Sequence, residues 1–143
     1  IDGPQMTDFS RSDAQHVLDT VMTPWLDELG MIVEEISDTG AVVRLPWDAR
    51  IARDGGLITG QALMSFADAA MVVVISSALG GFQKMATIDM TTSFLAPAFN
   101  TDVIARGQVI KRGKRMIYGR VDLETGDTGE SVALIQTTWT LLG

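Results

Sequence analysis

Cysteine is absent from the 143-residue sequence, and histidine occurs only once, as His16. Without cysteine the chain has neither disulfide bonds nor a thiol nucleophile, and one histidine cannot build a histidine-rich metal site. No G-x-S-x-G motif, glycine-rich phosphate loop or dinucleotide fingerprint is present. We therefore expect no metal ion and no cofactor, and the sequence does not support a serine–histidine–aspartate triad.

Positive charge is also scarce, since 11 lysines and arginines face 18 acidic residues and leave a formal net charge of −7. Such a surface argues against nucleic acid as a partner. No basic segment with a small-residue cleavage site precedes an apolar stretch, so we expect a cytoplasmic protein. Length and composition predict a single globular domain over residues 6–143. We expect residues 1–5 to be a cloning or processing remnant outside the fold.

The longest run of apolar character covers residues 55–82, in which Asp68 is the single charged residue. About 20 apolar residues can span a bilayer, but a carboxylate at the centre of such a span costs roughly 2.5–3.5 kcal/mol. Strand-like segments also follow the run, and a lone membrane span does not explain them. We therefore predict a buried helix from near Thr59 to Gly80–Gly81, and no membrane partner.

The rest of the chain is predicted to form short elements around this helix. A first helix should run from a cap at Ser12 to about Met22, and a second from Thr23 to Gly30. The turn signal "DTG" joins two strands, and residues 48–58 are predicted to be a loop. The predicted strands cover residues 31–37, 41–47, 84–96, 102–111, 115–124 and 130–142.

Short connections between the last four strands predict that consecutive strands pair antiparallel. In the strand 84–96, even-numbered residues such as Ile88 and Phe94 are expected to face the core. Thr87 is expected on the opposite, more polar face. The predicted fold class is α+β, with an antiparallel sheet around one long apolar helix.

Two segments, "GGLITGQALMSFADAAM" and "ATIDMTTSFLAPAFNTDVIARGQVIKRGKR", resemble hotdog-fold acyl-CoA thioesterases of the 4-hydroxybenzoyl-CoA thioesterase superfamily. The resemblance is to the phenylacetic-acid-degradation group, which has His-Gly-Gly at the start of the helix. An Asp follows nine residues after the His, and a later strand ends in Phe-Leu-x-Pro. The matching positions here are Thr59, Gly60, Gln61, Asp68 and 94–97. The resemblance covers about residues 41–142 and implies a hotdog fold, in which the sheet wraps around the long central helix.

Three positions depart from the group's pattern. Thr59 replaces the histidine, Gln61 replaces the second glycine, and Arg53 replaces an asparagine that often stands six residues before the histidine. The resemblance implies that these three residues contact the substrate. For Arg53 the alternative is a solvated loop position without any ligand.

Asp68 is the main candidate for a reactive group. Thioester hydrolysis needs a carboxylate that activates water or attacks the carbonyl, and a donor for the developing oxyanion. The N–H of Gly60 suits this task, because a first-turn N–H has no partner within its helix. Thr87 matches a hydroxyl position in related enzymes and would orient the water. The structural alternatives are a turn-bracing role for Asp68, a permissive turn at Gly60, and simple strand preference for Thr87.

The segment "KRGKR" at 111–115 places four cations around Gly113 in an acidic protein. In the resembling family this hairpin region can help to hold the phosphates of coenzyme A. That role would make Arg112, Lys114 and Arg115 substrate-binding residues. The alternative is a solvated β-turn whose charges aid solubility.

These features together predict an acyl-CoA or aryl-CoA thioesterase, a cofactor-free hydrolase whose substrate is a CoA thioester. The alternative is a non-catalytic acyl-CoA-binding domain with a regulatory function. A hotdog dehydratase is less favoured, because such enzymes usually pair a carboxylate with a histidine. Gly60 and Asp68 are eight residues apart, or about 12 Å along a helix, so one helix cannot easily bring both to one thioester. We therefore predict a homodimer with shared active sites, which agrees with the resembling family, and the resemblance implies further assembly into a homotetramer.

Overall fold

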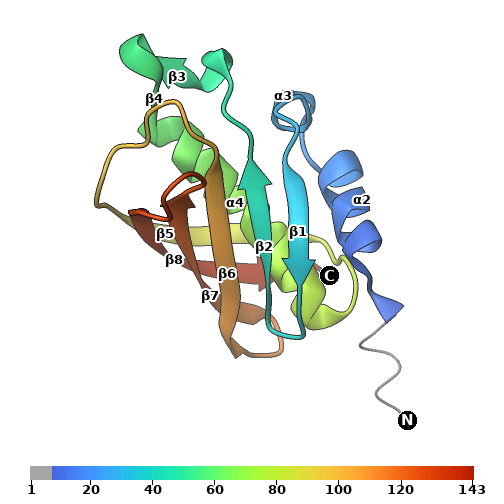
Figure 1. The fold of residues 1–143 in the computed structure, drawn as a ribbon. Helices are drawn as coiled ribbons and strands as arrows, with labels where there is room; N and C mark the ends of the chain where they lie inside the picture. Colours follow the sequence, from blue (N-terminus) through green and yellow to red (C-terminus); the bar gives the residue numbers. More distant parts are fainter. Residues whose placement is uncertain (1–7) are drawn as a thin grey trace.

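The computed structural model describes residues 8–143, and the predicted remnant at residues 1–5 lies outside them. A six-stranded antiparallel sheet packs against one long helix (Figure 1). The helical elements are α2 (Arg11–Val21), α3 (Pro24–Asp27), η1 (Ala49–Ile51), η2 (Asp54–Gly56) and α4 (Gly60–Leu79). The strands are β1 (Ile32–Ile36), β2 (Gly40–Leu45), β3 (Ala52–Arg53), β4 (Leu57–Ile58), β5 (Met85–Phe94), β6 (Val103–Arg112), β7 (Met116–Thr125) and β8 (Ser131–Leu141). The predicted α+β class is confirmed.

Helix α4 begins and ends where the sequence predicts. Thr59 is its N-cap, and the Thr59 hydroxyl accepts a 3.2 Å hydrogen bond from the Ala62 N–H. Gly80 ends the helix in the left-handed conformation, with a φ of 78° that glycine adopts without a Cβ clash. By length and composition α4 could cross a membrane, but 67% of its most apolar window is buried inside the fold. In this structure α4 is the core helix.

The strands of the large sheet lie in the order β1-β2-β6-β7-β8-β5. Strands β6, β7 and β8 pair consecutively, as predicted, but the expected pairing of β5 with β6 is wrong, because β5 pairs with β8. The connection after β5 is held near the start of α4, where the Ile58 N–H donates to Ala98 O and the Asn100 N–H donates to Gly56 O. The chain thereby passes β8 and β7 in the sheet order, and β6 pairs with β2 on one side and with β7 on the other.

Strand β5 contains a β-bulge at Ile88, which changes the faces of the residues around it. The pairing register with β8 shifts after Thr87, and Ile88 is 53% exposed. Met85 packs against the core before the bulge and Met90 does so after it, so the core-facing residues change from odd to even numbers. The expected core position of Ile88 is therefore wrong. Phe94 shares the predicted face with Met90 but is half exposed, because it lies at the end of the strand.

Two local predictions also need correction. The N-cap of α2 is Ser10 rather than Ser12, because Ser10 and Asp13 form a reciprocal capping box. Residues 48–58, predicted to be a loop, contain η1, η2 and the short antiparallel pair of β3 and β4. The turn of η1 is fixed by Asp48, whose carboxylate accepts a 2.8 Å hydrogen bond from the Arg50 N–H.

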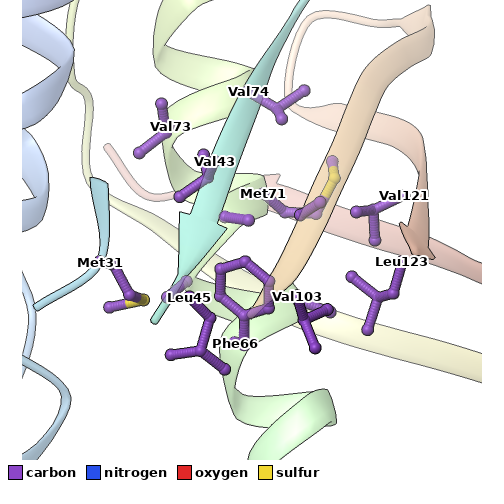
Figure 2. Close-up of a cluster of buried hydrophobic side chains, with 14 of the residues drawn as sticks. Met31, Val43, Leu45, Phe66, Met71, Val73, Val74, Val103, Val121 and Leu123 are labelled. Carbon is purple, nitrogen blue, oxygen red and sulfur yellow. The ribbon is translucent and has the colours of Figure 1, made fainter. Parts of the chain in front are cut away.

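Figure 2 shows how α4 packs against the sheet. Side chains of α4 at the centre of this contact include Phe66, Met71, Val73 and Val74, and all four are fully buried. Side chains of β2, β6 and β7 surround them, among which Figure 2 labels Val43, Leu45, Val103, Val121 and Leu123. Each square ångström of apolar surface buried here contributes roughly 25 cal/mol, which makes this contact the main source of stability.

Two glycines let the sheet approach α4 closely. Gly107 of β6 and Gly119 of β7 lie opposite the helix, and neither has a side chain to hold the helix away. A Cβ on Gly107 would lie 2.6 Å from Val74 Cγ2, and a Cβ on Gly119 would overlap Met71 Cε. Glycine within a strand commonly marks such a close approach.

Replacing Gly107 with alanine should therefore destabilise the fold by about 1–3 kcal/mol, because the stiff Val74 side chain must move away from the added methyl group. Urea unfolding measures the change in free energy. Gly81→Ala is the matched control, since a Cβ there meets nothing within 4 Å. Adding Val74→Ala to the Gly107 variant should cost less than Val74→Ala alone. Equal costs in the two backgrounds would show that the packing contact is not the cause.

Candidate active site

Asp68 and Thr87 form a hydrogen-bonded pair between α4 and β5. The Thr87 hydroxyl lies 2.6 Å from Asp68 Oδ1 and donates to it. Thr87 reaches the helix because it precedes the bulge at Ile88, so it does not lie on the outer polar face predicted for it. Within residues 8–143, Asp68 Oδ2 has no hydrogen-bond partner. One oxygen of the carboxylate is therefore held in place, and the other is available to a water molecule or a substrate.

Asp68 belongs to a stripe of α4 that the sheet leaves uncovered. Residues at i, i+4 and i+7 share one face of a helix, and Gln61, Ser65 and Asp68 have this spacing. Gln61 is exposed and the other two are half-buried, whereas the helix is buried continuously over 69–77. The apolar sequence around Asp68 predicts a fully buried carboxylate. In the structure, the protomer leaves this carboxylate only half-buried.

Gly60 is the first residue of α4, and its backbone is exposed. In the described part of the chain, no acceptor is hydrogen-bonded to the Gly60 N–H. The ring of Phe94 covers the position where a Cβ would lie, at 3.4 Å from its Cζ. Gly60 therefore presents an unpaired N–H at the positive end of a 20-residue helix, beside an aromatic ring.

The three residues that depart from the family pattern lie around the N-terminal end of α4. Thr59 caps the helix through its hydroxyl, Gln61 lies exposed in the first turn, and Arg53 lies exposed on β3. No ion pair to Arg53 occurs among the described residues. Thr59 and Gln61 flank Gly60 in the chain, and Arg53 pairs with Leu57 on the short β3–β4 ladder that precedes the helix. The pair of Asp68 and Thr87 lies about two helical turns further along α4.

The "KRGKR" hairpin lies at the same level of the sheet as Thr87. The pairing registers place Thr87, Trp139, Ile117 and Arg112 in one row across β5, β8, β7 and β6. With strands about 4.8 Å apart, Arg112 lies roughly 14 Å from Thr87 across the sheet. The hairpin therefore lies nearer to Asp68, in the middle of α4, than to Gly60 at its N-terminal end.

The cations of this hairpin differ from the other arginines that the structure places on the sheet. Arg44, Arg106 and Arg120 each form ion pairs with carboxylates, whereas no carboxylate among residues 8–143 pairs with residues 111–115. All five residues of the hairpin are exposed. Their charges are available to an external anion.

Sequence reasoning missed one further cation in this region, Lys84. Lys84 O accepts a hydrogen bond from the Leu142 N–H, and Arg115 O accepts one from the Leu141 N–H. The two basic residues therefore flank the end of β8. A single lysine in a sequence gives no signal for such proximity, because it depends on the pairing of β5 with β8.

Strand β5 forms one edge of the large sheet. In the described chain it pairs with β8 alone, so its other side presents unpaired backbone groups. Edge strands readily pair with another chain. Because Thr87 lies on β5 and Asp68 lies on the uncovered stripe of α4, a second protomer that pairs along β5 would come close to both side chains.

The family model of the thioesterase superfamily matches residues 55–132 of the sequence. This match spans more than half of the chain and includes Gly60, Asp68 and Thr87. The protein belongs to the thioesterase superfamily. No curated protein matches the sequence significantly.

Solved structures share the fold over almost the whole chain. A Bordetella protein from the thioesterase superfamily is 25% identical, with a TM-score of 0.82 over 92% of this chain and 98% of its own. PaaI of E. coli, from the phenylacetic acid degradation operon, is 21% identical, with a TM-score of 0.78 over 92% of each chain. A Haemophilus influenzae thioesterase is 16% identical, with a TM-score of 0.80 over 91% of this chain and 90% of its own. The predicted hotdog fold is confirmed.

Proposed function

We propose that the protein is an acyl-CoA or aryl-CoA thioesterase in which Asp68 is the reactive carboxylate. The observation that carries this proposal is the hydrogen bond from Thr87 to Asp68 on an uncovered stripe of the core helix. A carboxylate in an apolar helix destabilises the fold unless it is bonded, and a purely structural carboxylate would be expected to bond with both oxygens. Asp68 uses one oxygen and leaves the other accessible.

Hydrolysis of a thioester adds water to the carbonyl carbon and breaks the carbon–sulfur bond. Asp68 either takes a proton from the attacking water or attacks the carbonyl itself and forms an anhydride that water then opens. The products are the free acid and the free thiol of CoA, to which the proton returns. Thr87 holds Asp68 Oδ1, so Oδ2 is the oxygen that acts.

The tetrahedral intermediate carries a negative oxygen that needs a donor. The Gly60 N–H is unpaired at the positive end of α4, which suits it to stabilise this oxygen. An oxyanion-hole donor must lie about 3 Å from that oxygen. Gly60 and Asp68 of one helix are about 12 Å apart, so they belong to different sites.

A homodimer resolves this separation. Two copies of α4 packed antiparallel about a two-fold axis bring Gly60 of one protomer to Asp68 of the partner subunit, and produce two equivalent sites. The uncovered stripe of α4 and the open edge of β5 support this arrangement, because both lie where the second copy would pack. Two such dimers would form the homotetramer predicted from the family resemblance.

The "KRGKR" hairpin supports a CoA substrate. Its unpaired cations lie roughly 14 Å across the sheet from Thr87, a length that the pantetheine arm of CoA can bridge. A thioester carbon beside Asp68 and phosphates at the hairpin are therefore compatible with one bound molecule. Arg112 and Arg115 would bind the phosphates through their planar guanidinium groups, and Lys114 would bind them as a point charge.

The catalytic role is tested by release of free thiol from a panel of CoA thioesters. Asp68→Asn should nearly abolish hydrolysis, and Thr87→Val should lower kcat by about 10- to 100-fold, because a hydrogen bond to a charged group contributes about 1.5–3 kcal/mol. Thr87→Ser keeps the hydroxyl and should retain most of the activity.

Full turnover by a folded Asp68→Asn protein would exclude the proposed role. Tight binding of acyl-CoA without any hydrolysis by the unmodified protein would favour the regulatory alternative.

Removing the hairpin charges should weaken substrate binding more than it slows chemistry. Replacing Arg112, Lys114 and Arg115 with glutamine should raise KM several-fold with little change in kcat, and should reduce the salt dependence of KM. Arg106→Gln is the matched control, because Arg106 pairs with Glu124 at 2.8 Å. If truncated thioesters without phosphates respond to salt and to these substitutions as CoA thioesters do, the hairpin is only a solvated turn.

Shared sites should allow two inactive variants to restore each other. Gly60→Pro removes the N–H at a helix position that tolerates proline, and Thr59 already has the extended conformation that precedes proline, with ψ of 155°. Mixing it with Asp68→Asn should produce heterodimers with one intact site. Random exchange of equal amounts should recover about a quarter of the unmodified activity.

Gly60→Ala is the control for this experiment. Its Cβ would lie at an ordinary contact distance from Phe94, and the N–H is kept, so most of the activity should remain. Subunit exchange is checked by mass spectrometry of differently tagged chains. A mixture that exchanges subunits and stays inactive would contradict the shared-site arrangement.

A further inference from the structure

A hollow of about 320 Å³ lies between α3, η1 and the first turns of α4. Its apolar lining comes from Trp25, Leu29, Ile51 and Ala62. Trp25 is 55% exposed, so its ring is accessible from solvent at the edge of the hollow. No residue of the family motif other than Thr59 and Gln61 lines this space.

The hollow opens beside the proposed oxyanion donor. Thr59 and Gln61, which precede and follow Gly60, both line it. Ser65 lines it as well, and Gln61, Ser65 and Asp68 share one face of α4 by their spacing. A thioester whose carbonyl oxygen accepts from the Gly60 N–H therefore has this hollow within reach of its acyl group.

Arg50, the one basic residue among those that line the hollow, is already paired with an acidic side chain of the protein. The Arg50 guanidinium bonds to both oxygens of Asp48, at 3.1 Å and 2.8 Å for the shortest contacts, and to the Glu28 carbonyl at 3.0 Å. Through these side-chain hydrogen bonds Arg50 lowers the pKa of Asp48 to about 2. Arg50 is thus committed to a carboxylate of the protein and is not available to a carboxylate on a substrate.

We infer that this hollow receives the acyl group of the substrate, and that it selects an uncharged, apolar acyl group of medium size with Trp25 as a specificity-determining wall. This inference rests on the proposed function, because an acyl group reaches the hollow only when the thioester carbonyl binds at the Gly60 N–H. Its volume of about 320 Å³ lies at the small end of the range for ligand pockets, roughly 300–1,000 Å³, which suits a group of medium size. Octanoyl and benzoyl groups fit that size, whereas an acetyl group leaves most of the hollow empty and a palmitoyl group exceeds it.

The selectivity has two physical sources. Burying an acyl chain against Trp25, Leu29 and Ile51 removes apolar surface of both partners from water. A carboxylated acyl group such as succinyl would lose its hydration without gaining a free cation, since Arg50 is already paired. The hollow should therefore discriminate by length and by charge together.

Two substitutions test the inference in the full-length protein. Ser65→Phe fills the hollow from the α4 side, and Trp25→Ala removes its outer wall. Both should lower kcat/KM for octanoyl-CoA and benzoyl-CoA by roughly tenfold or more, and in Trp25→Ala the value for acetyl-CoA should change less than about twofold. Ile32→Ala is the control, because Ile32 is also an exposed apolar residue, at 42%, but lies on β1 outside the hollow.

Binding of S-octyl-CoA, a thioether that cannot be hydrolysed, is measured by calorimetry as a second readout. Its Kd should rise about tenfold in Trp25→Ala and stay unchanged in Ile32→Ala. Size-exclusion chromatography shows whether Ser65→Phe disturbs folding or assembly. If it does, the kcat/KM values and the Kd of Trp25→Ala test the inference by themselves.

The results separate this inference from the proposed function. Hydrolysis with an unchanged acyl preference in Trp25→Ala, or efficient hydrolysis of succinyl-CoA, would overturn the assigned pocket and leave the thioesterase proposal standing. Binding of S-octyl-CoA that depends on Trp25, in a protein that hydrolyses no thioester, would support the pocket and remove the catalytic proposal.

Discussion

The structure depends on the burial of α4. This helix is apolar on nearly all sides, so a single contact face does not satisfy it, and the sheet must curve around it. The close approach requires glycine at positions 107 and 119, where any side chain would meet α4. Coverage is complete over 69–77 and incomplete over the first turns. Gly60 and Asp68 both lie in this incompletely covered first part of the helix.

The β-bulge at Ile88 links this packing to the chemistry of the site. Without it, the alternation of β5 that buries Met90 would place Thr87 on the outer face of the sheet, away from Asp68. The extra residue reverses the alternation, so the same strand packs against the core at Met90 and presents a hydroxyl to the carboxylate at Thr87. The position of one hydrogen-bond donor is thus set by backbone pairing with β8.

Local signals in the sequence predict much of this structure, because helix ends and turns depend on neighbouring residues. The limits of α4 follow from the Thr59 cap and Gly80, whereas the hydrogen bond between Thr87 and Asp68 is not predicted, because Thr87 is expected on the outer face of its strand. The pairing of β5 with β8 and the bulge depend on contacts between distant segments, which a single sequence does not encode locally. The proximity of Lys84 to Arg115, and of Trp25 to Gln61, follows from the same long-range arrangement and was missed.

The replacement of the family histidine by Thr59 is compatible with this site because its hydroxyl caps α4. The cap satisfies the Ala62 N–H and leaves the Gly60 N–H unpaired among the described residues, so the proposed oxyanion donor does not depend on an imidazole. In the proposed dimer, the partner subunit covers the stripe around Asp68 and removes water from the carboxylate. Desolvation there strengthens the hydrogen bond from Thr87 and the pull of the helix dipole on the intermediate. The features that leave the single protomer incomplete are therefore the ones that, in the proposed dimer, a second copy would convert into a catalytic environment.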